Sequence, residues 1–323
     1  MKNEKLQMTN EKLIDLSIVI VSYNVRELLQ ECLKSVISHQ SLVTSQGLTT
    51  ETFVVDNAST DSSAQMVREK FATRGVQLIE NKNNRGFAAA NNQAFRESRG
   101  RYVMMLNPDT VVRAGAFETL VEFMDAHSRA GACGGKLVYA DGTFQHSAFM
   151  FPGLAQIFFD FFPLHARLLE GRINGRYPRS LYARGDPFQI DHPLGACFLV
   201  RRETAEQVGW LDEKFFLNCE EIDWAMRIKR AGWEIWCAPQ AEIVHYEAQS
   251  KKQFRNESFV NLWRARFYLF SKHYSRAFQF VAPALVRAGL RYLARQARRA
   301  RVTQDEKEKM LSAYQQIRNL MKQ

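Results

Sequence analysis

Polar side chains gather at the ends of four short apolar runs in the first half of the chain. The polar segments are Ser22-Tyr23-Asn24, Asp56-Asn57-Ala58-Ser59, residues 81–86 and Asn107-Pro108-Asp109. Each alone is ordinary, because turns before helices are commonly rich in Asn, Asp, Ser and Gly. Together they offer hydroxyl, amide, carboxylate and guanidinium groups, which favours a site for a polar anionic ligand. A carboxylate such as that of Asp109 could hold a divalent cation that bridges a diphosphate.

A second group of ionisable residues lies in the other half of the chain. Glu220, Glu221 and Asp223 fall in the first turn of an amphipathic helical pattern that follows an apolar stretch. One acid there would be ordinary, because acids interact favourably with the helix dipole. Three acids predict that at least one faces a cleft, where desolvation raises a carboxyl pKa as a general base requires. His245, taken alone, is more typical of a structural histidine than of a ligand.

The apolar pattern predicts the elements that position these side chains. Nearly continuous apolar runs predict parallel strands buried on both faces, at residues 16–21, 52–55, 76–79 and 102–106. Amphipathic segments predict helices at residues 25–38, 62–71, 86–98 and 114–127. Because the carboxyl ends of parallel strands share one edge of a sheet, we expect the four polar segments to meet in one cleft.

Composition narrows the classes of protein. The 323 residues are 46% hydrophobic and 24% charged, as in a globular protein, and the net charge of +10 favours an anionic partner. No G-x-G-x-x-G follows the first strand and no G-x-x-x-x-G-K-[ST] occurs, which disfavours a Rossmann dehydrogenase and a P-loop NTPase. Five scattered cysteines suggest neither a zinc site nor a disulfide framework. The start of the chain lacks a signal-peptide pattern and no run of about 18 apolar residues occurs, so we expect a cytoplasmic protein.

The ordered set of motifs resembles family 2 glycosyltransferases of the GT-A fold, in the rhamnosyltransferase-like branch. It covers about residues 16–250. The motifs are Val21-Ser22-Tyr23-Asn24, Val54-Val55-Asp56-Asn57-Ala58-Ser59, Asn84-Arg85-Gly86-Phe87-Ala88, Leu106-Asn107-Pro108-Asp109, Gly195-Ala196-Cys197-Phe198-Leu199-Val200-Arg201-Arg202, Glu220-Glu221-Ile222-Asp223 with Trp224 and Arg227, and His245.

The resemblance implies an α/β architecture with a mostly parallel sheet flanked by helices. The GT-A catalytic domain would span residues 1–250, with an aromatic-rich insert at 146–192. A basic helical C-terminal extension would follow over residues 251–323.

The resemblance also implies roles for the matching residues. The substrate-binding set would be Ser22, Tyr23, Asn24, Asp56, Asn57, Asn84, Arg85, Gly86, Asn107, Gly195 and Ala196. Within it, Ser22, Asn24 and Asp56 would hold the nucleoside. Asn84, Arg85 and Gly86 would border the nucleotide and the sugar.

The metal and the catalytic base are implied in the same way. Asp109 and His245 would bind Mg²⁺ or Mn²⁺, and Glu221 would be the catalytic base, supported by Glu220 and Asp223. The sequence departs from the family at two positions. Asn107 replaces the first acid of the metal motif, and Glu221 stands where Asp is commoner.

The implied activity is inverting, metal-dependent transfer of a sugar from a nucleotide-diphosphate donor. The branch suggests dTDP-rhamnose, and the acceptor would be a hydroxyl of a glycan or lipid-linked molecule in cell-surface polysaccharide synthesis. One alternative is an inactive scaffold that binds nucleotide sugars. Another is a basic nucleic-acid-binding protein, although no nucleic-acid-binding module is recognisable and we expect no nucleic-acid partner.

The basic C-terminal part suggests contact with a membrane. No acid occurs between Arg276 and Arg301, and Arg287, Arg291 and Arg295 share one helical face. This pattern suits an interfacial helix on anionic lipid, so we expect a peripheral protein on the inner face of the cell membrane. A helix docked on the catalytic domain, or a homo-oligomer contact, is the alternative. The aromatic insert is equally consistent with a packed subdomain and with an acceptor-side surface at the bilayer.

Overall fold

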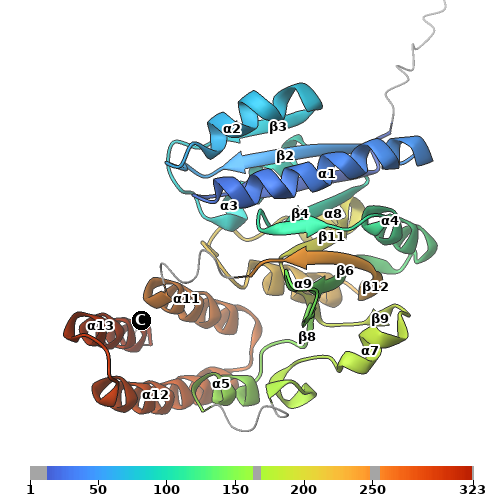
Figure 1. The fold of residues 1–323 in the computed structure, drawn as a ribbon. Helices are drawn as coiled ribbons and strands as arrows, with labels where there is room; N and C mark the ends of the chain where they lie inside the picture. Colours follow the sequence, from blue (N-terminus) through green and yellow to red (C-terminus); the bar gives the residue numbers. More distant parts are fainter. Residues whose placement is uncertain (1–12, 163–168, 248–254, 322–323) are drawn as a thin grey trace, which may run out of the picture.

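The first half of the chain forms alternating parallel strands and helices (Figure 1). The structure, a computed structural model, describes residues 13–162, 169–247 and 255–321. The start of the chain and the expected domain boundary at residue 250 lie outside these residues. The strands are β1 (Leu16–Ser22), β2 (Thr50–Asp56), β3 (Val76–Glu80) and β4 (Tyr102–Leu106). The helices are α1 (Arg26–Gln46), α2 (Ser63–Lys70), α3 (Phe87–Glu97) and α4 (Ala116–Ala126), with a 3₁₀ turn η1 (Ala72–Arg74). The four predicted strands and four predicted helices are confirmed.

The second half of the chain extends the same sheet. Its strands are β5 (Thr110–Val112), β6 (Ala130–Val138), β11 (Cys197–Arg201) and β12 (Glu234–His245), and the sheet order is β3-β2-β1-β4-β11-β6-β12-β5. β11 is antiparallel to both of its neighbours, and β5 is antiparallel to β12. The other strands on this path run in one direction, so the sheet is mostly parallel as expected.

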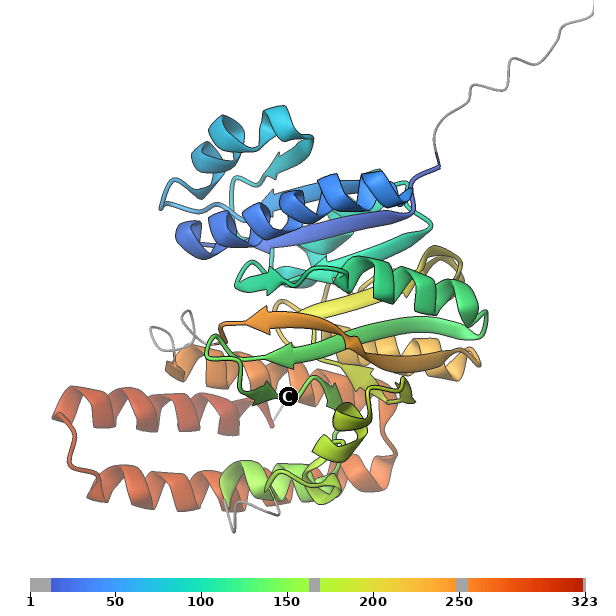
Figure 2. The ribbon, with the colours of Figure 1, turned by 45° about the vertical axis from the view of Figure 1, so that its right-hand side comes forward.

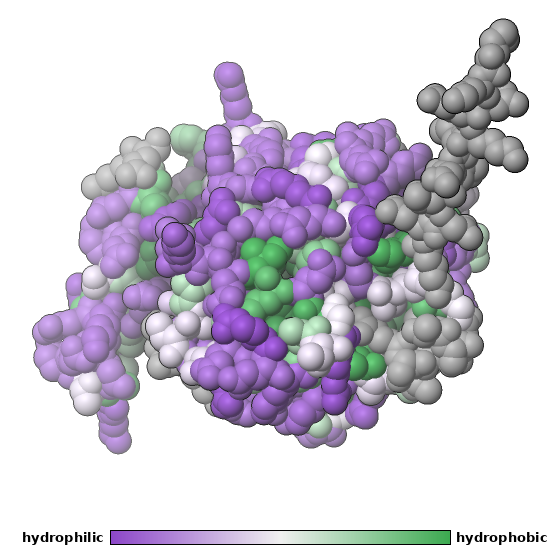
Figure 3. All heavy atoms as spheres, turned by 90° about the horizontal axis from the view of Figure 1, so that it is seen from above, coloured by the Kyte–Doolittle hydropathy of each residue, from purple (hydrophilic) through white to green (hydrophobic). Residues whose placement is uncertain are grey.

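Helices cover both faces of the sheet (Figure 1). On one face, side chains such as Leu33 of α1 and Leu120 of α4 pack into a buried cluster. On the other, Phe95 of α3 and Trp224 of α9 (Glu220–Arg230) belong to a second cluster, which also includes Ala205 of α8 (Arg202–Val208). Burial on both faces explains the continuous apolar runs of β1, β2 and β4. β3 was expected to be buried in the same way, but it lies at the edge of the sheet and is only partly buried, with Gln77 exposed. The molecule seen from above has a mainly hydrophilic surface with small hydrophobic patches (Figure 3).

Short elements connect β6 to β11. They are β7 (Phe144–Gln145), β8 (Ala148–Phe149), α5 (Leu154–Phe161), η2 (Arg172–Asn174), α7 (Arg179–Arg184), β9 (Phe188–Gln189) and β10 (His192–Pro193). Ile157 and Phe161 of α5 are buried, and Phe161 stacks on Trp263 with ring centroids 5.1 Å apart. This part of the aromatic insert therefore packs in a core, as one of the two interpretations predicted.

Three helices form the C-terminal part: α11 (Arg255–His273), α12 (Arg276–Arg299) and α13 (Gln304–Leu320). α5 lies along α12 (Figure 2). The contact requires a glycine, because a Cβ on Gly289 would lie 2.1 Å from Cγ of Phe161. α12 also continues through Pro283, although proline is unfavourable in a helix interior. No helix among the described residues is long and apolar enough to cross a bilayer.

Candidate functional site

At the edge where β1 and β2 end, two buried polar atoms have no hydrogen-bond partner among the residues that the structure describes. Ser22 lies opposite Asp56 in the strand register, and their relative exposures are 0% and 3%. Oδ2 of Asp56 accepts a hydrogen bond from the Ser59 amide at 2.9 Å. Oγ of Ser22 and Oδ1 of Asp56 have no partner among the described residues. Leaving a buried polar atom unsatisfied costs about 1–3 kcal/mol, so this pair marks a place for polar groups of a ligand.

Asparagine side chains fix the loops around this edge. Oδ1 of Asn24 accepts from the Thr60 amide at 2.7 Å, which joins the ends of β1 and β2. Nδ2 of Asn57 donates to Oδ1 of Asn84 at 2.9 Å, and Oδ1 of Asn57 accepts from the Arg85 amide at 3.0 Å. The loop before α3 is therefore held against the end of β2. Tyr23 and the Arg85 side chain are exposed beside these loops.

A close backbone contact joins the loop before α3 to the loop before α9. The Phe87 amide donates to the Phe216 carbonyl at 2.6 Å. Gly86 has a φ of 84°, and a Cβ there would lie 2.6 Å from the same carbonyl oxygen. Only glycine satisfies both the left-handed backbone and the close approach. This contact brings the segment that leads into Glu220 and Glu221 beside the loop that contains Asn84 and Arg85.

Asp109 and His245 meet because β5 pairs with β12. In this register His245 lies opposite Thr110, and Nε2 of His245 is 3.4 Å from Oδ1 of Asp109. Nδ1 of His245 is 3.1 Å from Oε1 of Gln145, whose Nε2 donates to Glu247 at 2.9 Å. Because a carboxylate only accepts, the Gln145 nitrogen faces Glu247 and its oxygen faces the histidine. In the neutral ring the proton is therefore on Nδ1, and the Nε2 lone pair faces Asp109.

The Asp109–His245 pair fits a divalent cation. The imidazole Nε2 and the carboxylate Oδ1 are both acceptors, and a cation bound by both would relieve their opposition. A carboxylate oxygen suits Mn²⁺ or Mg²⁺, and a metal-bound histidine typically donates its other ring N–H to a partner, as Nδ1 does here to Oε1 of Gln145. The described residues contain no group of three or more His, Cys, Asp or Glu side chains that could hold a metal. The pair therefore suits a cation that takes its other ligands from a substrate or water.

Close contacts connect the turn that contains Asp109 to the acids of α9. The Asn107 amide donates to the Ala196 carbonyl at 3.0 Å. A Cβ on the adjacent Gly195 would lie 3.6 Å from Cγ of Glu221, so this glutamate lies directly against the loop that leads into β11. The turn containing Asn107 and Asp109 is thus linked to Glu221 through two consecutive residues.

The three acids of α9 occupy different environments. Glu220 is 5% exposed, and burial, together with the charge of Glu221, raises the pKa of Glu220 well above its usual value. Asp223 contacts α11 and its own helix: its carboxylate is 2.6 Å from Nε2 of His273, 2.7 Å from Nζ of Lys272 and 2.9 Å from Nε of Arg227.

The cations around Asp223 determine its protonation. Burial would raise the pKa of Asp223, but the hydrogen bond from His273 and the charges of Arg227 and Lys272 lower it to about 2. Sequence reasoning gave His273 no role, because nothing near it in the chain distinguishes it from other histidines. Only the packing of α11 on α9 brings it to Asp223.

Comparisons with known proteins agree with this architecture. A family model described as glycosyl transferase family 2 matches residues 17–209. The chain is 29% identical over 251 residues to the N-acetylglucosaminyl-diphospho-decaprenol L-rhamnosyltransferase of Mycobacterium tuberculosis, covering 73% of this chain and 77% of that protein. It is 25% identical over 291 residues to the low-salt glycan biosynthesis hexosyltransferase Agl10 of Haloferax volcanii, covering 84% and 80%.

Solved structures share the fold. The mannosyltransferase PcManGT of Pyrobaculum calidifontis, in complex with GDP-Man and Mn²⁺, superimposes with a TM-score of 0.57 at 17% identity, over 96% of this chain and 88% of that one. This neighbour supports the GT-A fold. The family model covers more than half of the chain, and the chain therefore belongs to glycosyl transferase family 2, as a hexosyltransferase of the rhamnosyltransferase-like branch.

Proposed function

We propose that this enzyme transfers rhamnose from dTDP-rhamnose, with inversion, to a hydroxyl of a lipid-linked glycan in cell-surface polysaccharide synthesis. The observation that carries the proposal is the Asp109–His245 pair, with its acceptor atoms 3.4 Å apart. A divalent cation bound there would meet the diphosphate of a nucleotide sugar. The rhamnosyl group and the lipid-linked acceptor are proposed from the similarity to the mycobacterial N-acetylglucosaminyl-diphospho-decaprenol L-rhamnosyltransferase.

In this proposal the donor nucleoside binds at the ends of β1 and β2. Ser22 Oγ and Asp56 Oδ1, which have no partner among the described residues, would hydrogen-bond the ribose or the pyrimidine ring. Tyr23, Asn24 and Asn57 would shape this part of the site. Arg85 makes no side-chain hydrogen bond or ion pair with a described residue, and its guanidinium would face the diphosphate. The nucleotide and the sugar would thus lie along one edge of the sheet.

The metal would be Mn²⁺ or Mg²⁺, held by Asp109 and His245. When bound, it would neutralise charge that develops on the departing diphosphate. Gln145 fixes the ring of His245 so that Nε2 faces the carboxylate. Asn107 contributes no carboxylate, so Asp109 would be the single acidic ligand of the turn. The remaining ligands would come from the donor and from water.

Glu221 is the proposed catalytic base. It would take the proton of an acceptor hydroxyl, whose oxygen attacks the anomeric carbon as the bond from that carbon to the diphosphate breaks on the opposite side. Burial and the charge of Glu221 raise the pKa of Glu220, which favours a proton on Glu220. Asp223 would support the base indirectly, since it ties the start of α9 to α11. Gly195 and Ala196 would border the sugar beside Glu221.

Two glutamine variants test this assignment. Glu221→Gln should leave dTDP-rhamnose binding near normal and reduce turnover by at least about 100-fold, the usual contribution of a general base. Glu220→Gln should retain much more turnover, because the residue it replaces is already favoured in its neutral form. Donor binding is measured by thermal shift with Mn²⁺, and transfer by release of dTDP in the presence of an N-acetylglucosaminyl-diphospho-polyprenol acceptor. Full turnover in Glu221→Gln removes this residue from the role, and donor binding without any transfer by the wild type favours the inactive scaffold.

A lipid-linked acceptor would require the enzyme to work at a bilayer. We therefore propose that it acts as a peripheral protein on the inner face of the cell membrane. The C-terminal helices, with their excess of arginine, are the proposed contact. We also propose that residues 251–323 form a unit that serves this purpose beside the catalytic domain.

A further inference from the structure

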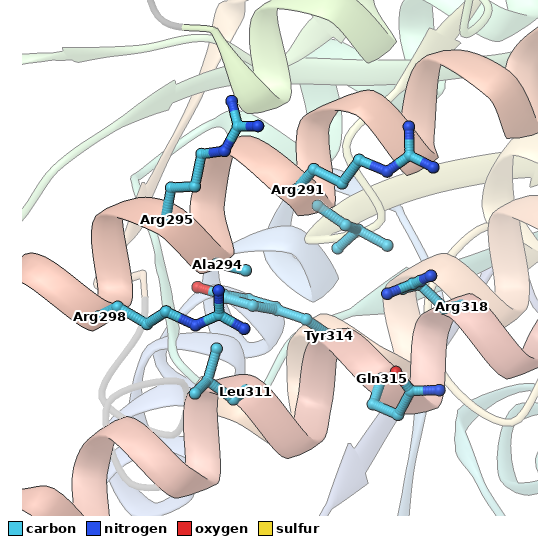
Figure 4. Close-up of a pocket in the computed structure, with 9 residues that line it drawn as sticks. Arg291, Ala294, Arg295, Arg298, Leu311, Tyr314, Gln315 and Arg318 are labelled. Atoms are coloured by element: carbon cyan, nitrogen blue, oxygen red, sulfur yellow. The ribbon is translucent and has the colours of Figure 1, made fainter.

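Four arginines surround a groove between α12 and α13. The groove has a volume of about 300 Å³. Arg291, Arg295 and Arg298 come from α12, and Arg318 comes from α13. Figure 4 shows Arg298 and Arg318 reaching into the space between the two helices, with Arg291 and Arg295 projecting from the α12 side. The groove is built from elements that carry none of the proposed donor-binding or catalytic residues.

The positive charge of this groove is not compensated within the described residues. None of the four arginines makes a hydrogen bond or an ion pair with another described residue. The acids of α13 are each engaged on their own segment: Asp305 with Lys309, Glu306 with Thr303 and Glu308 with Gln304. Like charges gathered on one surface repel each other, so an anion with several oxygens would be bound favourably here.

Apolar groups accompany the arginines. Leu290, which is 1% exposed, and Leu311 contribute to the lining of the groove. Phe280 lies on the same face of α12, because it precedes Arg291 by about three helical turns. Its side chain is 82% exposed. An exposed aromatic in line with unpaired arginines is the pattern of a helix that lies in a membrane interface, and it favours a lipid over a free phosphate or a nucleic acid.

We propose that the groove between α12 and α13 binds the phosphate of an anionic lipid head group while Phe280 enters the interface beside it. The inference rests on the proposed membrane location. It assigns the contact with the membrane to one site, the groove lined by Arg291, Arg295, Arg298 and Arg318. It predicts that binding to anionic vesicles depends more on the groove arginines than on the same number of arginines elsewhere on the extension.

The chain offers a matched control for this prediction. One full-length variant replaces the groove arginines: Arg291→Gln, Arg295→Gln, Arg298→Gln and Arg318→Gln. The control replaces four exposed arginines that do not line the groove: Arg276→Gln, Arg287→Gln, Arg299→Gln and Arg301→Gln. Both variants lose the same charge. Flotation with vesicles of phosphatidylglycerol in phosphatidylcholine, and of phosphatidylcholine alone, measures their binding.

The wild type and the control should bind the anionic vesicles, and the groove variant should bind them at least about tenfold more weakly. The proposal is overturned if both variants lose vesicle binding equally, or if the wild type shows no preference for anionic vesicles. Phe280→Ser should weaken vesicle binding without removing charge, which provides a second test if the groove variant fails to fold by circular dichroism.

Further measurements separate other ligands and the proposed function. One contrary result is that inorganic pyrophosphate stabilises the wild type but not the groove variant, while neither protein binds vesicles. That result would assign the groove to a soluble phosphate and overturn the proposal of a lipid ligand. Tighter binding of single-stranded RNA than of vesicles, or a dimer that needs the groove arginines, overturns it as well. The groove variant should keep the thermal shift with dTDP-rhamnose and Mn²⁺. If the wild type binds vesicles but not dTDP-rhamnose, the result supports lipid binding at the groove and contradicts the proposed rhamnosyl donor.

Discussion

Nε2 of His245 lies 3.4 Å from Oδ1 of Asp109, although the two residues belong to different halves of the chain. The short strand β5 brings them together by its antiparallel pairing with β12. The Tyr246 amide, which donates to the Asp109 carbonyl at 2.9 Å, continues this pairing. Two strand ends thus place a nitrogen and an oxygen acceptor side by side, and the proposed metal dependence rests on that pairing.

Asp109→Asn should weaken Mn²⁺-dependent binding of dTDP-rhamnose. The amide keeps the shape of the side chain but loses the charge that attracts a divalent cation. We expect at least about a tenfold loss of Mn²⁺ affinity, as for changes at metal-supporting positions. Titration calorimetry with Mn²⁺ in the presence of dTDP measures it. Removal of the metal with EDTA should abolish transfer by the wild type, and full activity in EDTA would contradict the metal assignment.

Gln145→Met should weaken Mn²⁺ binding although Gln145 does not itself face the metal position. The methionine has a similar length, but its thioether sulfur is only a weak acceptor for the hydrogen bond from Nδ1 of His245. Loss of such a supporting contact typically costs about 10–100-fold in metal affinity. Gln189→Met, at an exposed position of β9, is the matched control. Equal Mn²⁺ affinity in wild type and Gln145→Met, by the same calorimetry, would assign Gln145 a purely structural role.

The continuous apolar runs of β1, β2 and β4 made the first half of the fold predictable. A strand buried on both faces leaves a local signal in the sequence, and the polar residues at its end fall on a known edge. Ser22 and Asp56 could therefore be placed in one site before their register was known. The direction of β11 and the existence of β5 could not be predicted in this way, because each depends on contacts between distant segments.

Asp223→Asn should destabilise the protein strongly at neutral pH. The change removes a buried carboxylate charge that faces His273, Lys272 and Arg227, and breaking a buried ion pair from one side typically costs about 3–5 kcal/mol. Because the pKa of Asp223 is lowered to about 2, its stabilisation is present above the unfolded pKa of about 3.9 and is lost as the pH falls through 2.

The free energy of unfolding in urea, measured between pH 7 and pH 2, checks this pH dependence. The difference between wild type and Asp223→Asn should shrink below about pH 4. Asp186→Asn, at an exposed position, serves as the control. A difference that stays constant over the whole range would show that the carboxylate charge of Asp223 does not stabilise the fold.

The helix α12 illustrates why the C-terminal part was harder to predict. Pro283 and Gly289 are locally unfavourable in a helix interior. Both are accommodated because tertiary contacts compensate: the ring of Phe161 packs against the face of Gly289, and Ala282, Val286 and Leu290 are buried in the same cluster. The partner of Asp223 was missed for a related reason. His273 becomes recognisable only when α11 lies against α9.

Gly86→Ala should separate the role of the Gly86–Phe216 contact in donor binding from its effect on the backbone. The alanine would occupy a left-handed conformation, at a cost of about 1–2 kcal/mol, and its Cβ would also meet the Phe216 carbonyl at 2.6 Å. Gly75→Ala is a close control, since Gly75 has a φ of 86° but nothing within 4 Å of an added Cβ. Both variants should lose stability in thermal unfolding. Only Gly86→Ala should also lose affinity for dTDP-rhamnose, because it displaces the loop that holds Asn84 and Arg85 from the segment leading to Glu221. Equal donor affinity in the two variants would mean that this contact supports the fold alone.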